Sequence, residues 1–186
     1  MDPPHDAELM ARWRRGDVLA FEALVRRWQQ PVARFLHRLA GPGPAPDLCQ
    51  EVFLRLHAAR DHYRETGAFA AWLYRVALNV VRDAARRGRR APGLLNGHEP
   101  IDPAPPAEAV CQRRELALLV ADAVAGLPEP LRVVLALHHD EGLNFEEIAR
   151  LTGTPASTLK SRFAVALRRL RDRLQERGCG PGESAG

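Results

Sequence analysis

Residues 144–170, NFEEIARLTGTPASTLKSRFAVALRRL, decide the fold class of this chain. Their apolar spacing indicates two short helices joined by a tight turn, and the second helix is polar and basic at its start. Pro155 lies where the first turn of a helix tolerates proline. This layout is typical of a helix-turn-helix whose second helix enters the major groove of DNA.

Two segments far apart in the sequence are strongly basic. Residues 75–90 carry six arginines against Asp83 alone, and residues 155–177 carry one lysine and six arginines against Asp172 and Glu176. Two cationic segments suit a polyanion that is contacted at two places. The plain alternative is that these charges only keep helix faces soluble.

The rest of the chain predicts an all-α fold with two small helical domains. Apolar residues recur at helical spacing throughout, and strand signals are nearly absent. Asp17 is expected to cap a long helix that continues through Pro31. Residues 88–107 contain five prolines and three glycines and are expected to form a flexible linker. The expected organisation is a first domain at 6–87, a linker at 88–107, a second domain at 108–177 and a disordered tail at 178–186.

The apolar residues that recur at helical spacing are expected to form the core. In the first domain, which contains a turn at 41–44, they are Leu9, Trp13, Leu19, Phe21, Leu24, Val25, Trp28, Val32, Phe35, Leu36, Leu39, Leu48, Val52, Phe53, Leu56, Phe69, Trp72, Leu73, Val76, Ala77 and Val80. In the second domain, a helix is expected over 107–125 and another over 131–141, closed by Gly142. The last helix is expected to bury Leu159, Phe163, Ala166, Leu167, Leu170 and Leu174.

The sequence argues against metal, cofactor and membrane chemistry. Cys49, Cys111 and Cys179 are widely spaced, so we expect reduced thiols in a cytoplasmic protein. The run at 138–141 is His-His-Asp-Glu, but neighbours on a helix point about 100° apart and no other ligands converge. The first residues lack the pattern of a signal peptide, and no run of about 18 apolar residues is present.

Four further motifs resemble those of one family. The chain is similar to bacterial RNA polymerase sigma factors of the sigma-70 family, extracytoplasmic-function (ECF) type, over residues 8–86 and 111–174. DLCQEVFLRL at 47–56 resembles the region 2 helix that binds the polymerase clamp, and FAAWLYRVALN at 69–79 resembles the promoter-melting helix. LPEPLRVVL at 127–135 and EGLNFEEIA at 141–149 resemble region 4.

The resemblance implies a dissociable initiation subunit that reads a −35 element and melts a −10 element, without being an enzyme. Its implied partners are promoter DNA, core RNA polymerase through the β′ clamp helices and the β flap, and an anti-sigma factor, with no membrane insertion and no cofactor. The implied polymerase-binding residues are Asp47, Gln50, Glu51, Phe53 and Leu54. The implied −10 residues are Asp61, His62, Tyr63, Arg64, Arg75, Asn79, Arg82 and Arg86. The implied −35 residues are Thr154, Ser157, Thr158, Lys160, Ser161, Arg162 and Val165.

The residue chemistry fits these assignments. A trapped single strand needs cations for its phosphates and aromatic or polar groups for its bases, and the 61–86 segment supplies both. Phe69 and Trp72, however, are spaced as core residues, and we expect them to be scaffold first. Ala164-Val165 replaces the larger, often basic pair that many relatives carry, which favours either contact with a thymine methyl group or weaker dependence on the −35 element.

Two other classes of protein remain open from the sequence. A conventional helix-turn-helix regulator would bind duplex DNA without polymerase and would need a ligand pocket or dimer stripe in 8–86. A helical adaptor or anti-factor would bind only proteins and would leave both basic helices without a purpose.

Overall fold

The computed structural model describes residues 5–61, 63, 69–90 and 108–177, with the side chains of 89–90 and 108–116 outside that description. The chain divides into two compact units, residues 1–98 and 99–186. Every regular element within the described ranges is helical. The predicted all-α fold class is therefore confirmed.

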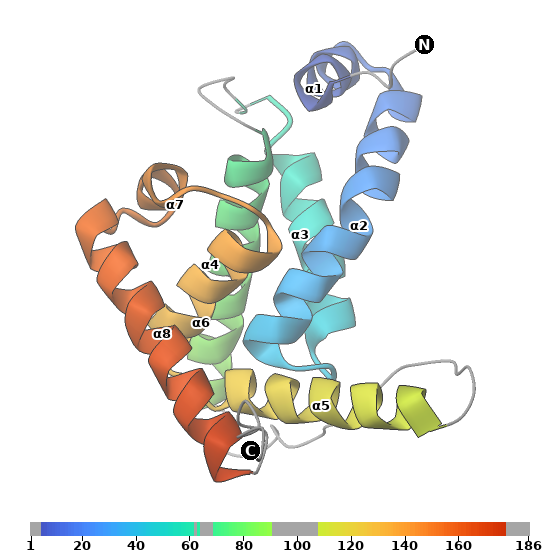
Figure 1. Cartoon of the computed structure of the whole chain (residues 1–186). Coiled ribbons are helices and arrows are strands. Elements are labelled where there is room, and N and C mark those ends of the chain that lie inside the picture. The colour runs from blue at the N-terminus through green and yellow to red at the C-terminus, as the bar shows by residue number, and fades with distance from the viewer. Residues whose placement is uncertain (1–4, 62, 64–68, 91–107, 178–186) are drawn as a thin grey trace. The chain divides into compact units, whose positions relative to one another are not determined.

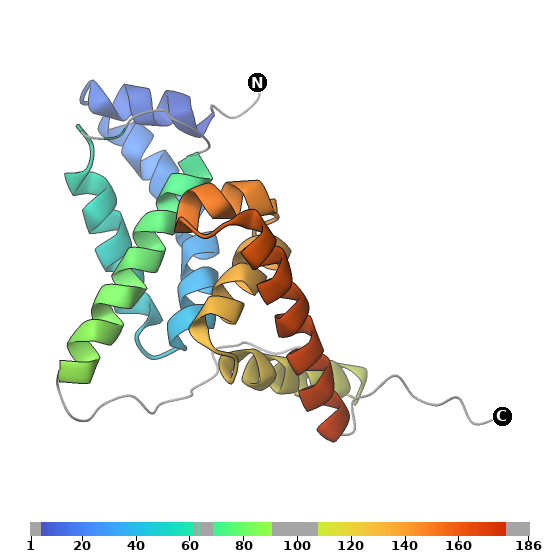
Figure 2. The same ribbon diagram turned by 90° about the vertical axis from the view of Figure 1, so that its left-hand side faces the viewer.

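The first unit is a helical bundle. Figures 1 and 2 show α2, α3 and α4 side by side, with α1 across the N-terminal end of α2. Its described helices are α1 (Asp6–Arg14), α2 (Val18–Ala40), α3 (Ala45–Ala58) and α4 (Phe69–Arg90). The apolar stripes meet inside the bundle, where Leu24, Val32, Phe35, Leu36, Leu48, Val52, Leu56, Leu73, Tyr74, Ala77 and Val80 are buried.

The boundaries of α2 follow from local chemistry. Gly16 has a φ of 99°, which favours glycine, and the Asp17 carboxylate then accepts a hydrogen bond from the Ala20 amide, as predicted for an N-cap. The helix continues through Pro31 to Ala40, which confirms that this proline does not end it. One core prediction here is wrong: Leu19 is 69% exposed, because it lies on the outer face of α2, away from the buried stripe that begins at Ala20 and Leu24.

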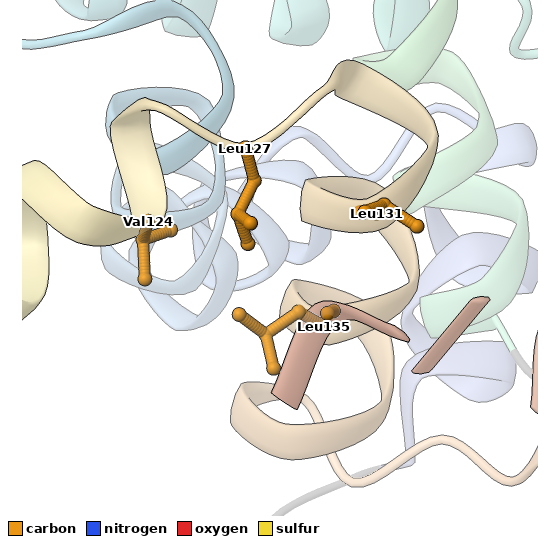
Figure 3. Packing of buried hydrophobic residues seen from close by; sticks show 5 residues of the cluster. Val124, Leu127, Leu131 and Leu135 are labelled. Carbon is orange, nitrogen blue, oxygen red and sulfur yellow. The ribbon is translucent and has the colours of Figure 1, made fainter. Parts of the chain in front are cut away.

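The second unit packs a short helical array against one long helix. Its described elements are α5 (Glu108–Ala125), α6 (Glu129–Leu135), the π-helical turn η1 (Ala136–Asp140), α7 (Phe145–Thr152) and α8 (Ala156–Glu176). Figure 3 shows the core in close-up, where Val124, Leu127, Leu131 and Leu135 converge; Ala166 belongs to the same cluster, with Phe163 and Leu170 partly buried against it. Leu167, predicted to be buried, is 46% exposed because it lies off the stripe of Phe163, Ala166 and Leu170.

Two predicted helix boundaries differ from the structure. The helix expected over 131–141 begins at Glu129 and passes into a π-helical turn before Gly142, whose φ is 67°. The helix α4 extends to Arg90, past the expected start of the linker at 88. The remaining linker residues, 91–107, and the tail, 178–186, lie outside the described residues.

Arginines close the C-terminal end of α5. Arg132 Nη1 donates to the Ala125 carbonyl at 2.6 Å, Arg173 Nη1 donates to the Ala123 carbonyl at 3.2 Å, and Arg177 pairs with Asp122 at 2.6 Å. Cations stabilise the negative end of a helix dipole and its unpaired carbonyls. Part of the basic segment at 155–177 therefore holds the second unit together, and only the rest is available to a polyanion.

Candidate nucleic-acid and polymerase interfaces

The surface of α3 carries the residues predicted to bind polymerase. Asp47, Gln50 and Leu54 are exposed, while Glu51 is half-buried, and their spacing places all four on one face of the helix. Phe53 is also half-buried, between this face and the core. Leu54 is 57% exposed, so its side chain is open to contact with another protein.

The exposed stripe of α4 carries four of the residues predicted to bind the −10 element. Arg75, Asn79, Arg82 and Arg86 are all exposed and follow one another at intervals of three or four residues. The opposite face of the helix is buried in the bundle through Leu73, Ala77 and Val80. The structure therefore brings three cations and one amide together on a single side of α4.

An aromatic cluster joins Tyr63 to the start of α4. Tyr63 is only 5% exposed, and its ring centroid lies 6.0 Å from Phe69 and 5.2 Å from Trp72. The Tyr63 ring is thus part of the core in this structure, and Phe69 is buried as expected of scaffold. Asp61 is exposed, whereas His62 and Arg64 lie outside the described residues.

The helix-turn-helix is fixed by a capping box and a left-handed turn. The Asn144 side chain accepts hydrogen bonds from the amides of Glu146 and Glu147, and the Glu147 carboxylate accepts one from the Asn144 amide. Gly153 ends α7 with a φ of 70°. Thr152 Oγ1 donates to the Ile148 carbonyl at 2.8 Å and accepts from the Thr154 amide at 3.3 Å, which ties the turn to α7.

The N-terminal half of α8 presents the predicted −35 residues. Ser157, Lys160, Ser161 and Val165 are exposed, on the side away from the buried Leu159 and Ala166. Thr154, Thr158 and Arg162 are half-buried at the edges of this surface. The helix begins after Pro155, which serves as the N-cap residue, so the first amides of α8 have no side-chain cap.

A histidine that the sequence did not single out for this role fixes the turn before α7. The Nδ1 atom of His138 lies 2.7 Å from the Leu143 carbonyl, and its ring stacks on Phe145 at 4.2 Å. The same ring meets Phe163 of α8 edge-on at 4.8 Å. His138 therefore packs η1, α7 and α8 together, and no local sequence signal marks it.

A second feature missed by the sequence reading links α3 to α4. Arg55 donates to Glu51 at 2.7 Å and to Asp83 at 2.8 Å, and Arg86 also donates to Asp83. The hydrogen bonds from Arg55, and then those from Arg86, hold the pKa of Asp83 below its usual value. Asp83 and Arg55 are 28 positions apart, so only the packing of the two helices brings them together.

The described residues offer little for metal or thiol chemistry. No group of three or more His, Cys, Asp or Glu side chains among them could hold a metal ion. Burial raises the pKa of the Cys49 thiol, whose Sγ lies 3.8 Å from the Gln29 carbonyl oxygen, and a raised pKa disfavours the reactive thiolate. In the same part of the chain, no helix is long and apolar enough to cross a bilayer.

The exposed cations of α4 and the helix-turn-helix of α7 and α8 indicate a helical DNA-binding protein with two compact units. The family model for sigma-70 region 2 matches residues 24–91, and the model for sigma-70 region 4 matches residues 117–170. The ECF RNA polymerase sigma-E factor of Escherichia coli K12 is 32% identical over 180 residues, covering 91% of this chain and 94% of the relative. That of Haemophilus influenzae is 32% identical over 182 residues, covering 91% and 95%.

Solved structures show the same fold. CnrH, determined in complex with the cytosolic domain of CnrY, matches with a TM-score of 0.71 and 26% identity over 92% of this chain and 97% of that chain. The sigma factor RpoE of Bartonella quintana, determined with the anti-sigma factor NepR, matches with a TM-score of 0.70 and 24% identity over 83% and 96%. The chain belongs to the ECF branch of the sigma-70 family of RNA polymerase sigma factors, as its motifs had predicted.

Proposed function

We propose that the three surfaces divide the work of promoter recognition. The face of α3 with Asp47, Gln50, Glu51 and Leu54 binds the polymerase clamp, together with Phe53. The exposed stripe of α4 and the preceding segment hold the melted −10 strand, and the first half of α8 reads the −35 element. The observation that supports this division best is the α4 stripe, because a conventional duplex-binding regulator has no use for a second cationic surface in the first unit.

On α4, Arg75, Arg82 and Arg86 contact phosphates, while Asn79 hydrogen-bonds a base edge. Each phosphate contact contributes without regard to sequence, whereas an amide can discriminate between bases. Because Tyr63 is buried, we assign its ring to the support of the segment and leave base capture to Asp61 and the neighbouring residues His62 and Arg64. Binding of unstacked bases supplies the free energy that favours the open duplex, and no covalent bond is made or broken by this chain.

On α8, Ser157, Ser161 and Val165 lie at the centre of the groove-facing surface, with Thr154, Thr158, Lys160 and Arg162 at its margins. A side chain at the margin reaches phosphates or a base edge at the side of the groove. The small Val165 fits contact with a thymine methyl group better than hydrogen-bonded readout. The uncapped first amides of α8 add donors for a phosphate.

A protein partner that masks these surfaces is also proposed. The CnrH structure shows a relative of this chain bound to the cytosolic domain of another protein, CnrY. We infer that an anti-sigma factor binds this chain when it is not bound to polymerase, and that the chain acts in the cytoplasm, where core polymerase is found.

The test of the α8 assignment is transcription in vitro with core polymerase on genomic fragments that carry the cognate promoters. We expect Lys160→Ala with Arg162→Ala to lower −35-dependent transcription at least tenfold. The matched control is Arg168→Ala with Arg169→Ala, which removes the same charge from exposed positions further along α8. Equal losses in both double variants, or none in the first, would show that the groove-facing surface is placed wrongly.

A further inference from the structure

The ion pairs between α3 and α4 join the two proposed surfaces of the first unit. Glu51 lies on the face of α3 that we assign to polymerase, and Arg86 lies on the stripe of α4 that we assign to the melted strand. Between them, Arg55 and Asp83 complete an unbroken series of four charged side chains of alternating sign. The inference below rests on these proposed assignments.

The two central residues are each shared between two partners. Arg55 Nε donates a hydrogen bond to Glu51 Oε1, and Arg55 Nη1 donates one to Asp83 Oδ2. The Asp83 carboxylate therefore accepts one hydrogen bond from Arg55 at Oδ2 and another from Arg86 at Oδ1. A guanidinium and a carboxylate pair most strongly when two N–H groups meet both oxygens. Arg55 makes only one bond to Asp83, because its Nε faces Glu51 and the second oxygen of Asp83 is occupied by Arg86.

We propose that Asp83 is a shared carboxylate that couples polymerase binding on α3 to strand binding by Arg86. When a cationic group of polymerase pairs with Glu51, the hydrogen bond between Glu51 and Arg55 is lost. Arg55 can then direct two N–H groups at the two carboxylate oxygens of Asp83. Arg86 then loses its carboxylate partner and pairs with a phosphate of the melted strand. The first unit thus binds single-stranded DNA more tightly when α3 is occupied.

The charges and exposures of the four groups fit this exchange. The Arg86 side chain is 67% exposed, so it can swing from Asp83 to a phosphate without disturbing the core. The Glu51, Arg55 and Asp83 side chains are each about one-third exposed (36%, 35% and 33%), so a partner can reach Glu51 while Arg55 and Asp83 stay in place. Asp83 is the one acid in the 75–90 segment, and a second bond from Arg55 would offset its repulsion of DNA.

The experiment uses the full-length free chain and a fluorescein-labelled 12-nucleotide oligothymidine, because the proposed Arg86 contact is to phosphate and needs no particular base. Glu51→Gln removes the carboxylate charge from Arg55 and mimics capture of Glu51 by polymerase. We expect it to tighten binding about 1.5- to 5-fold, the range expected for release of one exposed ion pair. The slope of log K against log [NaCl] should steepen by about 0.7, as for one added phosphate contact on a single strand.

Two further variants separate the coupling from simple charge effects. Arg86→Ala should weaken binding, and Glu51→Gln should then bring no gain in the Arg86→Ala background. Glu22→Gln removes an acid that pairs with Arg26 on α2 and is 50% exposed, against 36% for Glu51, and it should leave affinity and slope unchanged. Thermal unfolding of each variant checks that the bundle is intact.

The coupling is overturned if Glu51→Gln binds like the wild type, if its gain persists without Arg86, or if Glu22→Gln gives the same gain. These outcomes leave the placement of the strand on α4 intact as long as Arg86→Ala weakens binding. If Arg86→Ala binds like the wild type, the placement of the strand fails as well, and the coupling fails with it.

Discussion

The capping box of α7 gives the sharpest test of how the helix-turn-helix is held. Replacing Asn144 by Ala removes the acceptor for two amides, those of Glu146 at 3.0 Å and Glu147 at 2.9 Å. Both amides are exposed, so water replaces the lost acceptor in part, and the cost is expected near the middle of the range for N-caps, about 1 kcal/mol. The helix has eight residues, so this first turn is a large part of it.

For a unit of this size, a loss of about 1 kcal/mol lowers the melting temperature by roughly 4–8 °C. The distribution of tryptophan makes the measurement specific. Trp13, Trp28 and Trp72 all lie in the first unit, so tryptophan fluorescence reports only that unit, whereas far-UV circular dichroism reports both. We expect Asn144→Ala to shift the second unit's transition in circular dichroism and to leave the fluorescence transition unchanged.

The control variant is Asn144→Asp, which keeps a side-chain acceptor and adds a negative charge at the N-terminus of α7. It should unfold like the wild type or slightly later. An equal loss of stability in Asn144→Asp and Asn144→Ala would refute the reasoning, because the acceptor could not then be the cause. A shift in the fluorescence transition would show that the two units do not unfold separately.

Two further predictions concern the arginines that join helices. A Cβ atom on Gly126 would lie 1.7 Å from Arg173 Nη1, so Gly126→Ala should displace that guanidinium from the Ala123 carbonyl and destabilise the second unit by about 0.5–1.5 kcal/mol in urea unfolding. In an Arg173→Ala background the same change should be neutral or slightly stabilising, and an undiminished cost there would contradict this reading. Because the pKa of Asp83 is held below its ordinary 3.8 by Arg55 and then Arg86, its ion pairs stabilise the first unit above pH 3.8 and are lost as the pH falls through the lowered value. The stability gap between the wild type and Asp83→Asn, followed by tryptophan fluorescence, should therefore be largest near neutral pH and should narrow below pH 3.8; a gap that is constant with pH would contradict the assignment.

The local features of this protein were accessible from sequence because each depends on residues a few positions apart. Asn144 with Glu147, Gly153 and Pro155 specify the start of α7, its end and the start of α8 by backbone chemistry alone. Asp17 likewise specifies the start of α2 as its N-cap. Helical spacing also predicts the buried face of α4, whereas the residues on its exposed stripe are assigned to the −10 element by the family resemblance.

The features that escaped depend on how helices pack. Arg55 and Asp83 meet because α3 and α4 lie together, and nothing in either helix indicates its partner. The resemblance implies that Tyr63 contacts the −10 strand, yet its ring packs against Phe69 and Trp72. Arg173 and Arg177 were counted as part of a surface for a polyanion, but they bind the end of α5. Charge in a sequence gives the number of cations and not their partners.

The central claim is that the α3 face binds core polymerase, so the most direct measurement is the affinity of the purified chain for core RNA polymerase. The test variant is Gln50→Ala with Leu54→Ala, and the matched control is Gln30→Ala with Leu19→Ala, at exposed positions of α2. The account predicts that the test variant loses at least tenfold in affinity, while the control binds like the wild type and both remain folded. Wild-type affinity in the test variant, or no association of the wild-type chain with core polymerase once any inhibitor has been removed, would contradict it.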